Sequence, residues 1–270
     1  LMVHIAILDG VKIIHCYITI YSTTISPFDD FLTVFSHSFS FFPLLLLPSS
    51  FFLSSFLSFA FQLKNLQAIM SKPRVAIIIY SLYHHVYTLA ESAKIGIEAA
   101  GVKPDLFQVP ETLTPEILKL VKAPPKPDIP IAEPKILNNY DAFLFGIPTR
   151  FGNMPAQWKG FWDGTGGQWA RGDLRGKYAG VFVSTGTPGG GQETTVINTL
   201  STLAHHGIVY VPFGYGSPRL ADLNEVHGGS PWGAGTFAGA DGSREVTELE
   251  KSIAQQQGED FIKTITQFKQ

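Results

Sequence analysis

The sequence predicts an α/β fold built on an open parallel sheet. Three segments, 75–79, 140–146 and 178–184, consist mainly of β-branched, aromatic and small residues, as expected for strands buried on both faces of such a sheet. Each segment ends in a short loop rich in Ser, Thr, Gly or Arg, and each loop leads into a pattern of helical period. This alternation favours a layered α/β domain with helices on both faces of the sheet.

The first loop has the composition of a phosphate-binding site. Its side-chain donors, counted into the first turn of the helix that follows, are Ser81, Tyr83, His84, His85 and Thr88. The start of this helix adds free N–H groups and the positive end of the dipole. Because the loop contains no Lys or Arg, hydrogen bonds and the dipole would have to hold a phosphate dianion. The alternative is an ordinary strand–helix turn.

The loops at 147–156 and 185–193 follow the next two strands. Ligands of open parallel sheets bind outside the carboxyl ends of the strands, near the point where strand order reverses, so we expect the three loops to form one site. Their composition suits a flat aromatic ligand with a phosphate tail. The glycine cluster at 186–191 follows a late strand and so is not a dinucleotide fingerprint. Its glycines would let N–H groups approach a planar ring, or would form a flexible turn.

Six motifs occur in order along the chain. They are residues 81–86 (SLYHHV), 148–153 (PTRFGN), 165–169 (TGGQW), 184–193 (STGTPGGGQE), 203–207 (LAHHG) and 228–233 (GGSPWG). From about Met70 to its end, the chain resembles the WrbA-type NAD(P)H:quinone oxidoreductases, most closely their fungal members. The resemblance implies a flavodoxin-like three-layer sandwich with a five-stranded parallel sheet, and one non-covalent FMN per subunit. It also implies a homotetramer, or dimer of dimers, whose active sites lie at subunit contacts.

The resemblance also assigns residues to the cofactor. The phosphate would be held by Ser81, Leu82, Tyr83, His84, His85 and Val86. The ribityl chain and ring edge would contact Thr149, Arg150 and Phe151, and the isoalloxazine would contact Ser184, Thr185, Gly186, Thr187, Pro188 and Gly189. Tyr83 matches the residue that contacts the nicotinamide, Trp169 the residue that lines the substrate cavity, and His205 the histidine that reaches the FMN site.

Several of these residues have structural alternatives. Trp169 follows Thr-Gly-Gly in an expected loop, where it could fill an apolar gap or a subunit contact. His205 and His206 close a predicted helix, where an imidazolium favours the negative end of the dipole, and we expect one of the two to do only that. Arg150 could form a structural ion pair, although its place in a strand-end loop better suits an anionic or carbonyl-rich ligand.

The chain departs from the family pattern at two positions. His84 stands where the family often has glycine, and a side chain there makes a positive φ unfavourable. The loop therefore either takes a negative φ or differs slightly in its phosphate geometry. Pro188 lengthens the third loop by one residue relative to some bacterial members, so the residue there that touches the ring is left open.

The function implied is two-electron reduction of quinones to hydroquinones, in a ping-pong relay from NADH or NADPH through FMN. Tyr83 and His205 would hydrogen-bond the quinone oxygen, and no acid–base dyad is required because the cofactor carries the chemistry. The alternative is a flavodoxin-like one-electron carrier or a non-enzymatic FMN-binding protein, and a less favoured one is an azo or nitro reductase. Such carriers commonly dock through a strongly acidic face, which this domain lacks.

Charge, histidine spacing and cysteine content limit the classes of ligand and partner that the sequence predicts. The whole chain has 20 basic and 22 acidic residues, so nothing points to nucleic acid. Adjacent histidines diverge and no carboxylate or cysteine spacing completes a metal site, so we expect no metal. Its one cysteine, Cys16, lies outside the domain and excludes disulfides within it. We expect a cytoplasmic protein.

Residues 1–69 differ in composition from the rest, being rich in Phe, Leu and Ser. The stretch 41–61 is long enough to cross a bilayer, but two prolines and five serines weaken a spanning helix. We expect translation from upstream of a start at Met70, and an extension without a stable fold that does not pack on the domain at 70–270. The alternative is a genuine anchor, and the protein would then be membrane-associated.

The other expected elements complete the domain. They are a strand at 105–109, a short capped helix at 114–121, a proline-rich connector at 122–134, a fifth strand at 207–212 and a final helix at 247–268. The glycine-rich stretch at 215–242 is too long for an idle link, so we expect it to cover an active site or a neighbour.

Overall fold

The computed structural model describes residues 2–8, 11–17, 19–22, 35–38 and 72–267, and the chain divides into two compact units, residues 1–68 and 69–270. In the first unit β1 (Met2–Leu8) pairs antiparallel with β2 (Val11–Tyr17), and β3 (Thr19–Ser22) with β4 (Phe35–Ser38). The sequence did not predict these strands. An isolated pair of strands is only marginally stable in water.

The apolar stretch 41–61 lies outside the described residues. Among the helices that the structure describes, none combines the length and the apolar character needed to cross a membrane.

The second unit contains the parallel sheet. Its strands are β5 (Val75–Ile79), β6 (Asp105–Gln108), β7 (Ala142–Pro148), β8 (Tyr178–Thr185), β9 (Val209–Tyr210) and β10 (Gly235–Phe237). The order is β6-β5-β7-β8, with β9 and β10 both pairing with the outer edge of β8. The first strand thus lies between the second and third, which places the reversal of strand order between β5 and β7. The predicted parallel sheet with five strand positions is confirmed.

The fifth position of the sheet is shared by two short strands. Val209 of β9 pairs with Tyr178 at the start of β8, and Gly235 of β10 pairs with Val183 near its end. Pro212 has no N–H with which to continue the ladder, and the chain leaves the sheet near it. The predicted strand at 207–212 is therefore correctly placed but too long. Within the stretch 215–242, β10 joins the sheet, so this part is not an idle link; the expectation that the stretch covers an active site or a neighbour stays a prediction.

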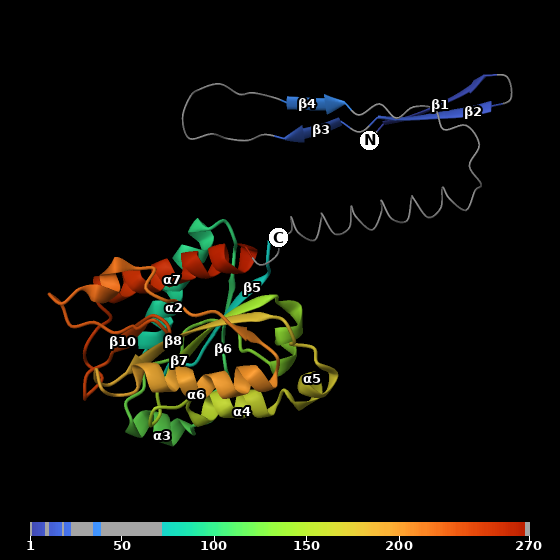
Figure 1. Cartoon of the computed structure of the whole chain (residues 1–270). Helices are drawn as coiled ribbons and strands as arrows, with labels where there is room; N and C mark the ends of the chain where they lie inside the picture. The colour runs from blue at the N-terminus through green and yellow to red at the C-terminus, as the bar shows by residue number, and fades with distance from the viewer. Residues whose placement is uncertain (1, 9–10, 18, 23–34, 39–71, 268–270) are drawn as a thin grey trace. The chain divides into compact units, whose positions relative to one another are not determined.

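Helices cover both faces of the sheet (Figure 1). One face carries α2 (His85–Ala99) and α7 (Glu248–Gln267), and the other carries α4 (Ala156–Asp163) and α6 (Gln192–His205). Strand β5 shows why: Ile77 and Ile79 pack in the core with α2 and α7, whereas Ile78 packs in the core with α4. The shorter helices are α3 (Pro115–Leu120), α5 (Gly166–Arg171) and the 3-10 turns η1 (Pro134–Asn139) and η2 (Pro218–Ala221).

Helix α5 corrects one prediction, because Trp169 lies on this helix and not in a loop. Gly166 and Gly167 are ordinarily signals of a loop. Here Thr165 anchors the turn by donating from Oγ1 to Trp162 O at 2.6 Å, and Gly172 ends the helix with a φ of 70°. The Thr165 hydroxyl fixes the turn before the helix and Gly172 ends it, so the segment is helical despite the low helix propensity of the two glycines.

Candidate functional site

The loops that follow β5, β7 and β8 meet at one edge of the sheet. Thr149 N donates to Ser184 O at 2.8 Å, which joins the second loop to the end of β8. Thr195 Oγ1, on the helix after the third loop, donates to Thr149 Oγ1 at 2.8 Å. Tyr80 N, just before the first loop, donates to Gly146 O at 3.2 Å. The predicted convergence of the three loops is confirmed.

The first loop leaves backbone donors free for an anion. Helix α2 begins at His85, and the N–H groups of its first turn have no acceptor inside the helix. Ser81 Oγ accepts one of them, from Tyr87, at 3.3 Å. The remaining N–H groups, with the positive end of the helix dipole, fit a phosphate.

His84 adopts the conformation that its side chain disfavours. Its φ is 69°, so the loop keeps the left-handed turn that glycine would make there. The ring compensates by donating from Nε2 to Pro125 O at 2.8 Å. Of the two alternatives, the negative φ is therefore wrong.

Two other predicted donors are already bonded within the protein. The buried His85 ring donates from Nε2 to Arg244 O at 2.7 Å, and Thr88 Oγ1 donates to His84 O at 3.1 Å. His85 thus ties the first loop to the segment before α7. The N–H groups, more than these side chains, are the donors that the loop offers to a ligand.

The second loop is a tight turn at Arg150–Asn153, closed by reciprocal backbone hydrogen bonds of 2.6 and 3.1 Å. Phe151 (φ 56°) and Gly152 (φ 73°) give it the geometry of a type I′ turn. Phe151 is 91% exposed and lies under the Arg150 guanidinium, 4.7 Å from its ring centroid. Arg150 forms no ion pair with any residue that the structure describes, so both side chains are free to meet a flat, anionic ligand.

The third loop has a fixed base and an exposed tip. Ser184 and Thr185 are buried, and Thr185 Oγ1 donates to Thr187 O at 2.9 Å while accepting from Gln192 Nε2 at 2.9 Å. Gly186 to Gly189 are exposed. A planar ring could therefore contact the backbone of this tip without displacing a core side chain.

A partly buried polar cluster behind the first loop was not predicted. Lys126 comes from the proline-rich connector, and its Nζ lies 2.7 Å from Glu111 Oε2 and 2.9 Å from Ser81 O. Burial alone would raise the pKa of Glu111, but hydrogen bonds from Lys126, the Leu113 N–H and Tyr80, with the Lys126 charge, lower it to about 2. Burial and the bond to this carboxylate raise the pKa of Tyr80 well above its usual range. No local pattern indicates this cluster, because Lys126 lies 45 residues from Ser81, the loop residue that it contacts.

The structure separates the three predicted catalytic residues. Tyr83 lies in the first loop, where its Oη donates to Val121 O at 2.9 Å. His205 ends α6, whose 14 residues span about 20 Å from the third loop. Trp169, on α5, is on the same side as His205, because Thr165 Oγ1 lies 2.7 Å from His206 Nε2 (Figure 1).

Within one chain, Trp169 and His205 therefore do not join the three loops, and their assignment to the FMN site stays a prediction that would need a second copy of the chain. Helices of this fold run back toward the amino ends of the strands, so residues at their far ends cannot reach the carboxyl edge. His206 has a structural role: Nδ1 donates to Thr202 O at 2.8 Å and its ring packs 5.2 Å from Trp162. These contacts are consistent with a structural role for one of the paired histidines, which stays a prediction.

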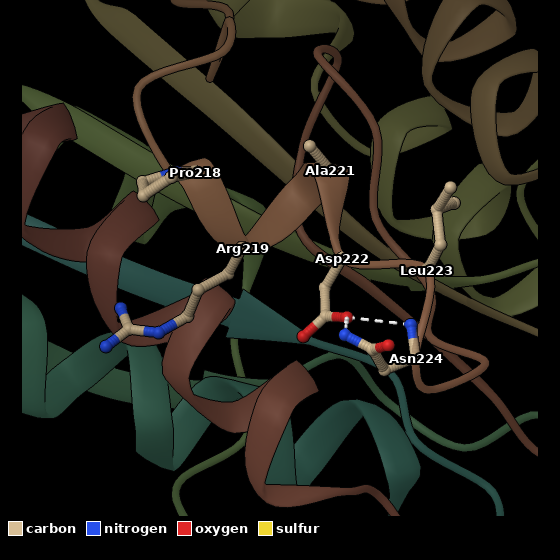
Figure 2. Close-up of a pocket in the computed structure, with 6 residues that line it drawn as sticks. All are labelled: Pro218, Arg219, Ala221, Asp222, Leu223 and Asn224. Atoms are coloured by element: carbon tan, nitrogen blue, oxygen red, sulfur yellow. Dashed lines mark hydrogen bonds between the residues drawn. The ribbon is translucent and has the colours of Figure 1, made fainter.

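Two pockets lie away from the three loops. One is lined by Pro218, Arg219, Ala221, Asp222, Leu223 and Asn224, where Asp222 Oδ1 accepts from the Asn224 backbone and side chain (Figure 2). The other lies between Lys72, Arg74, Lys103, Asp105 and Tyr140. No predicted site residue lines either pocket. Within 72–267 and the four N-terminal strands, no group of three or more His, Cys, Asp or Glu residues could hold a metal ion.

The sheet order, the three loops and the open helix start together define a flavodoxin-like α/β protein with a site for a phosphorylated flavin. The fold agrees with a solved flavodoxin, WrbA-like protein from Agrobacterium tumefaciens, at a TM-score of 0.50 and 17% identity over 73% of this chain and 99% of that one. Residues 73–217 match the family model described as NADPH-dependent FMN reductase. The chain belongs to this family.

Curated relatives are closer in sequence. NAD(P)H quinone oxidoreductase PST1 of Candida albicans is 71% identical over 73% of this chain and 99% of its own length. Protoplast secreted protein 2 of Saccharomyces cerevisiae is 62% identical over 73% of this chain and 100% of its own. These similarities confirm the family resemblance seen in the six motifs.

Proposed function

We propose that this chain is an FMN-dependent NAD(P)H:quinone oxidoreductase. The observation that carries the proposal is the convergence of three loops at the carboxyl edge of the sheet, in a chain 71% identical to a protein named as such an enzyme. When bound, FMN supplies the hydride chemistry that links a nicotinamide donor to a quinone acceptor.

The residues of this chain would hold and orient the cofactor. The backbone of residues 82–86 would bind the phosphate at the start of α2, Thr149 to Phe151 would contact the ribityl chain and ring edge, and the exposed tip at 186–189 would support the isoalloxazine. Phe151 offers an exposed aromatic face beside this site. Tyr83 is 41% exposed, and its hydroxyl donates to Val121 O. Its oxygen would accept from the nicotinamide amide, and a bond to a quinone oxygen would require the hydroxyl to leave Val121 O.

A second copy of the chain would complete the site. Trp169 is 58% exposed, and it lies with His205 at the end of the domain away from the three loops. An exposed Trp is typical of an interface. We therefore propose a homotetramer, in which Trp169 and His205 of one copy approach the FMN site of another.

Mixed oligomers test this sharing of sites. A variant that binds FMN weakly at the first loop, Ser81→Ala, is co-expressed with Trp169→Ala, and activity is assayed at an FMN concentration that leaves the Ser81→Ala sites largely empty. If each site uses two copies, some mixed sites carry neither change, so quinone reduction exceeds the mean of the two separate variants. A mixture that never exceeds that mean, or a fully active monomer by native mass spectrometry, would contradict the shared site.

Stopped-flow mixing separates an enzyme from a one-electron carrier. NADH or NADPH should bleach the flavin absorbance of the holoprotein in a single two-electron step, and benzoquinone should restore it with no protein partner present. Slow bleaching by both nicotinamides, or reoxidation in two resolved one-electron steps, would favour the carrier.

Quinone reductase activity, measured in separate cell fractions, also tests in which compartment the protein acts. We propose that the protein works in the cytoplasm, although the name of one relative, Protoplast secreted protein 2, makes the medium a second compartment to assay. Quinone reductase activity should follow the cytosolic marker after cell fractionation. Activity confined to the membrane pellet or the medium would contradict the proposal.

A further inference from the structure

The end of α3 and the proline-rich connector that follows it dock on the first loop through three side-chain hydrogen bonds. Tyr83 Oη donates to Val121 O at 2.9 Å, at the C-cap of α3. In the connector, Pro125 O accepts from His84 Nε2 at 2.8 Å, and Lys126 Nζ donates to Ser81 O at 2.9 Å. This segment is therefore part of the wall of the first loop.

Lys126 is held in place more firmly than a surface lysine. Its Nζ pairs with Glu111 Oε2 at 2.7 Å and lies 4.4 Å from the centroid of the Tyr80 ring, and its side chain is only 25% exposed. Glu111 is fixed in turn by Tyr80 Oη and by Gln157 Nε2 on α4. Because the partners of the ammonium are rigid, its direction toward Ser81 O is fixed.

The bond from Lys126 constrains the peptide that joins Ser81 to Leu82. This peptide is planar and trans, so its C=O and its N–H point in opposite directions. Holding Ser81 O on the side of Lys126 therefore turns the Leu82 N–H to the other side. No described residue accepts a hydrogen bond from this N–H. A charged donor on the C=O also polarises the peptide and strengthens its N–H as a donor.

We propose that Lys126 is a positioning residue for phosphate binding: it orients and polarises the Ser81–Leu82 peptide so that the Leu82 N–H donates to the FMN phosphate. The inference rests on the proposal that the first loop holds the phosphate. It also explains how a loop without Lys or Arg binds a dianion. The positive charge is the Lys126 ammonium, which bonds to Ser81 O on the side of the peptide opposite the phosphate.

Lys126→Met tests the proposal by removing the charge while keeping the length of the side chain. FMN should bind about tenfold more weakly to the FMN-free variant in a fluorescence-quenching titration, whereas riboflavin, which lacks the phosphate, should bind as it does to the parent. Lys135→Met is the matched control, since Lys135 is exposed and pairs only with Glu133. Equal weakening of FMN and riboflavin, or weakening of neither, would overturn the proposal.

Two further variants separate positioning from general support of the structure. Lys126→Arg keeps a cationic donor for Ser81 O and should restore most of the FMN affinity. Glu111→Gln keeps the ammonium and its bond to Ser81 O. The Gln amide oxygen replaces only one of the two accepting carboxylate oxygens, but FMN affinity should stay within about twofold because Lys126 still donates to Ser81 O. If both variants lose as much FMN affinity as Lys126→Met, the cluster serves only the fold and the proposal fails.

Ser81→Ala separates this failure from a failure of the phosphate site itself. If Ser81→Ala weakens FMN but Lys126→Met does not, the loop binds the phosphate and the role of Lys126 is wrong. If neither variant distinguishes FMN from riboflavin, the placement of the phosphate is wrong.

Discussion

His84 holds its backbone in a conformation that favours glycine, with a φ of 69°. For a residue with a Cβ this conformation costs roughly 1–2 kcal/mol. The bond from its ring to Pro125 O returns about 1 kcal/mol, so the two effects nearly cancel. The side chain thus serves to fasten the connector at little net change in stability.

Substitutions at His84 should separate these two effects. His84→Ala loses the ring bond and keeps the strain, whereas His84→Gly loses both. We expect the Ala variant to be less stable than the Gly variant by about 1 kcal/mol in urea denaturation of the FMN-free protein. Equal stabilities would show that the loop relaxes to a negative φ when the ring is removed.

Ser81 should control flavin affinity rather than turnover. Its hydroxyl is buried and accepts from Tyr87 N, at the start of the helix that would face the phosphate. Hydrogen bonds to charged groups contribute about 1.5–3 kcal/mol, so Ser81→Ala should weaken FMN binding about tenfold or more. Fluorescence titration measures the affinity, and turnover at saturating FMN should change little. Ser92→Ala, which removes a hydroxyl bonded to Thr88 O on the same helix, is the control.

Protonation of Glu111 should lower the free energy of unfolding at acidic pH. Its pKa falls from 4.5 to about 2 in the folded protein, so its stabilising contribution is complete above pH 4.5 and is lost as the pH falls toward 2. Glu111→Gln should flatten this part of the profile of unfolding free energy against pH. Urea denaturation of the FMN-free protein between pH 2 and 7 measures it, with the exposed Glu98→Gln as the control. If the unfolding free energy of Glu111→Gln still falls at low pH as it does in the parent, other carboxyl groups cause that loss of stability.

At the scale of elements, α2 and α7 pack at glycine positions. A Cβ at Gly96 would collide with the backbone of Gln255, and a Cβ at Gly258 with the backbone of Ala93. Rigid backbone cannot move aside as the end of a side chain can. The two glycines therefore set the close approach of the helices that cover one face of the sheet.

Gly258→Ala should accordingly destabilise the domain by about 1–3 kcal/mol, because extra atoms in a filled interface force the helices apart. Gly160→Ala is the matched control. Gly160 also lies in a helix, but a Cβ there would meet nothing within 4 Å. Its replacement should stabilise by about 0.5–1 kcal/mol through helix propensity. Thermal denaturation compares the two, and shifts of the same sign would contradict the packing argument.

At the scale of the whole molecule, the site and the core lie within the second unit. All three loops and the connector belong to residues 72–267, and both clusters of the hydrophobic core do as well. A chain that begins at Met70 should therefore fold and bind FMN as well as the full chain. Thermal denaturation and the ratio of flavin to protein absorbance test this, and a loss of either after truncation would give residues 1–69 a part in the fold.

Trp169→Ala should affect quinones more than FMN if a second copy supplies this residue. We expect the KM for quinones to rise more than FMN affinity falls, since the indole would form a cavity wall and not a flavin contact. Steady-state kinetics and fluorescence titration together measure the two effects. Loss of FMN with an unchanged KM would place Trp169 against the flavin.

The sequence by itself determined the fold and the three loops. Strands buried on both faces, such as 75–79, carry an unbroken apolar run, and each loop follows its strand directly. These are local signals, so neighbouring residues suffice to predict them. The family motifs added the cofactor and the reaction in the same way.

Only the tertiary structure decided what depends on distant segments. Lys126 contacts Ser81, 45 residues earlier in the chain. Gly235 of β10 pairs with the same strand, β8, as Val209 of β9, which lies 26 residues earlier. The bond that offsets the strain of the left-handed turn at His84 is accepted by the remote carbonyl of Pro125, and the separation of Trp169 and His205 from the loops depends on where α5 and α6 end. Such contacts form only when the whole domain packs, because no local pattern records which remote atom will meet a given side chain.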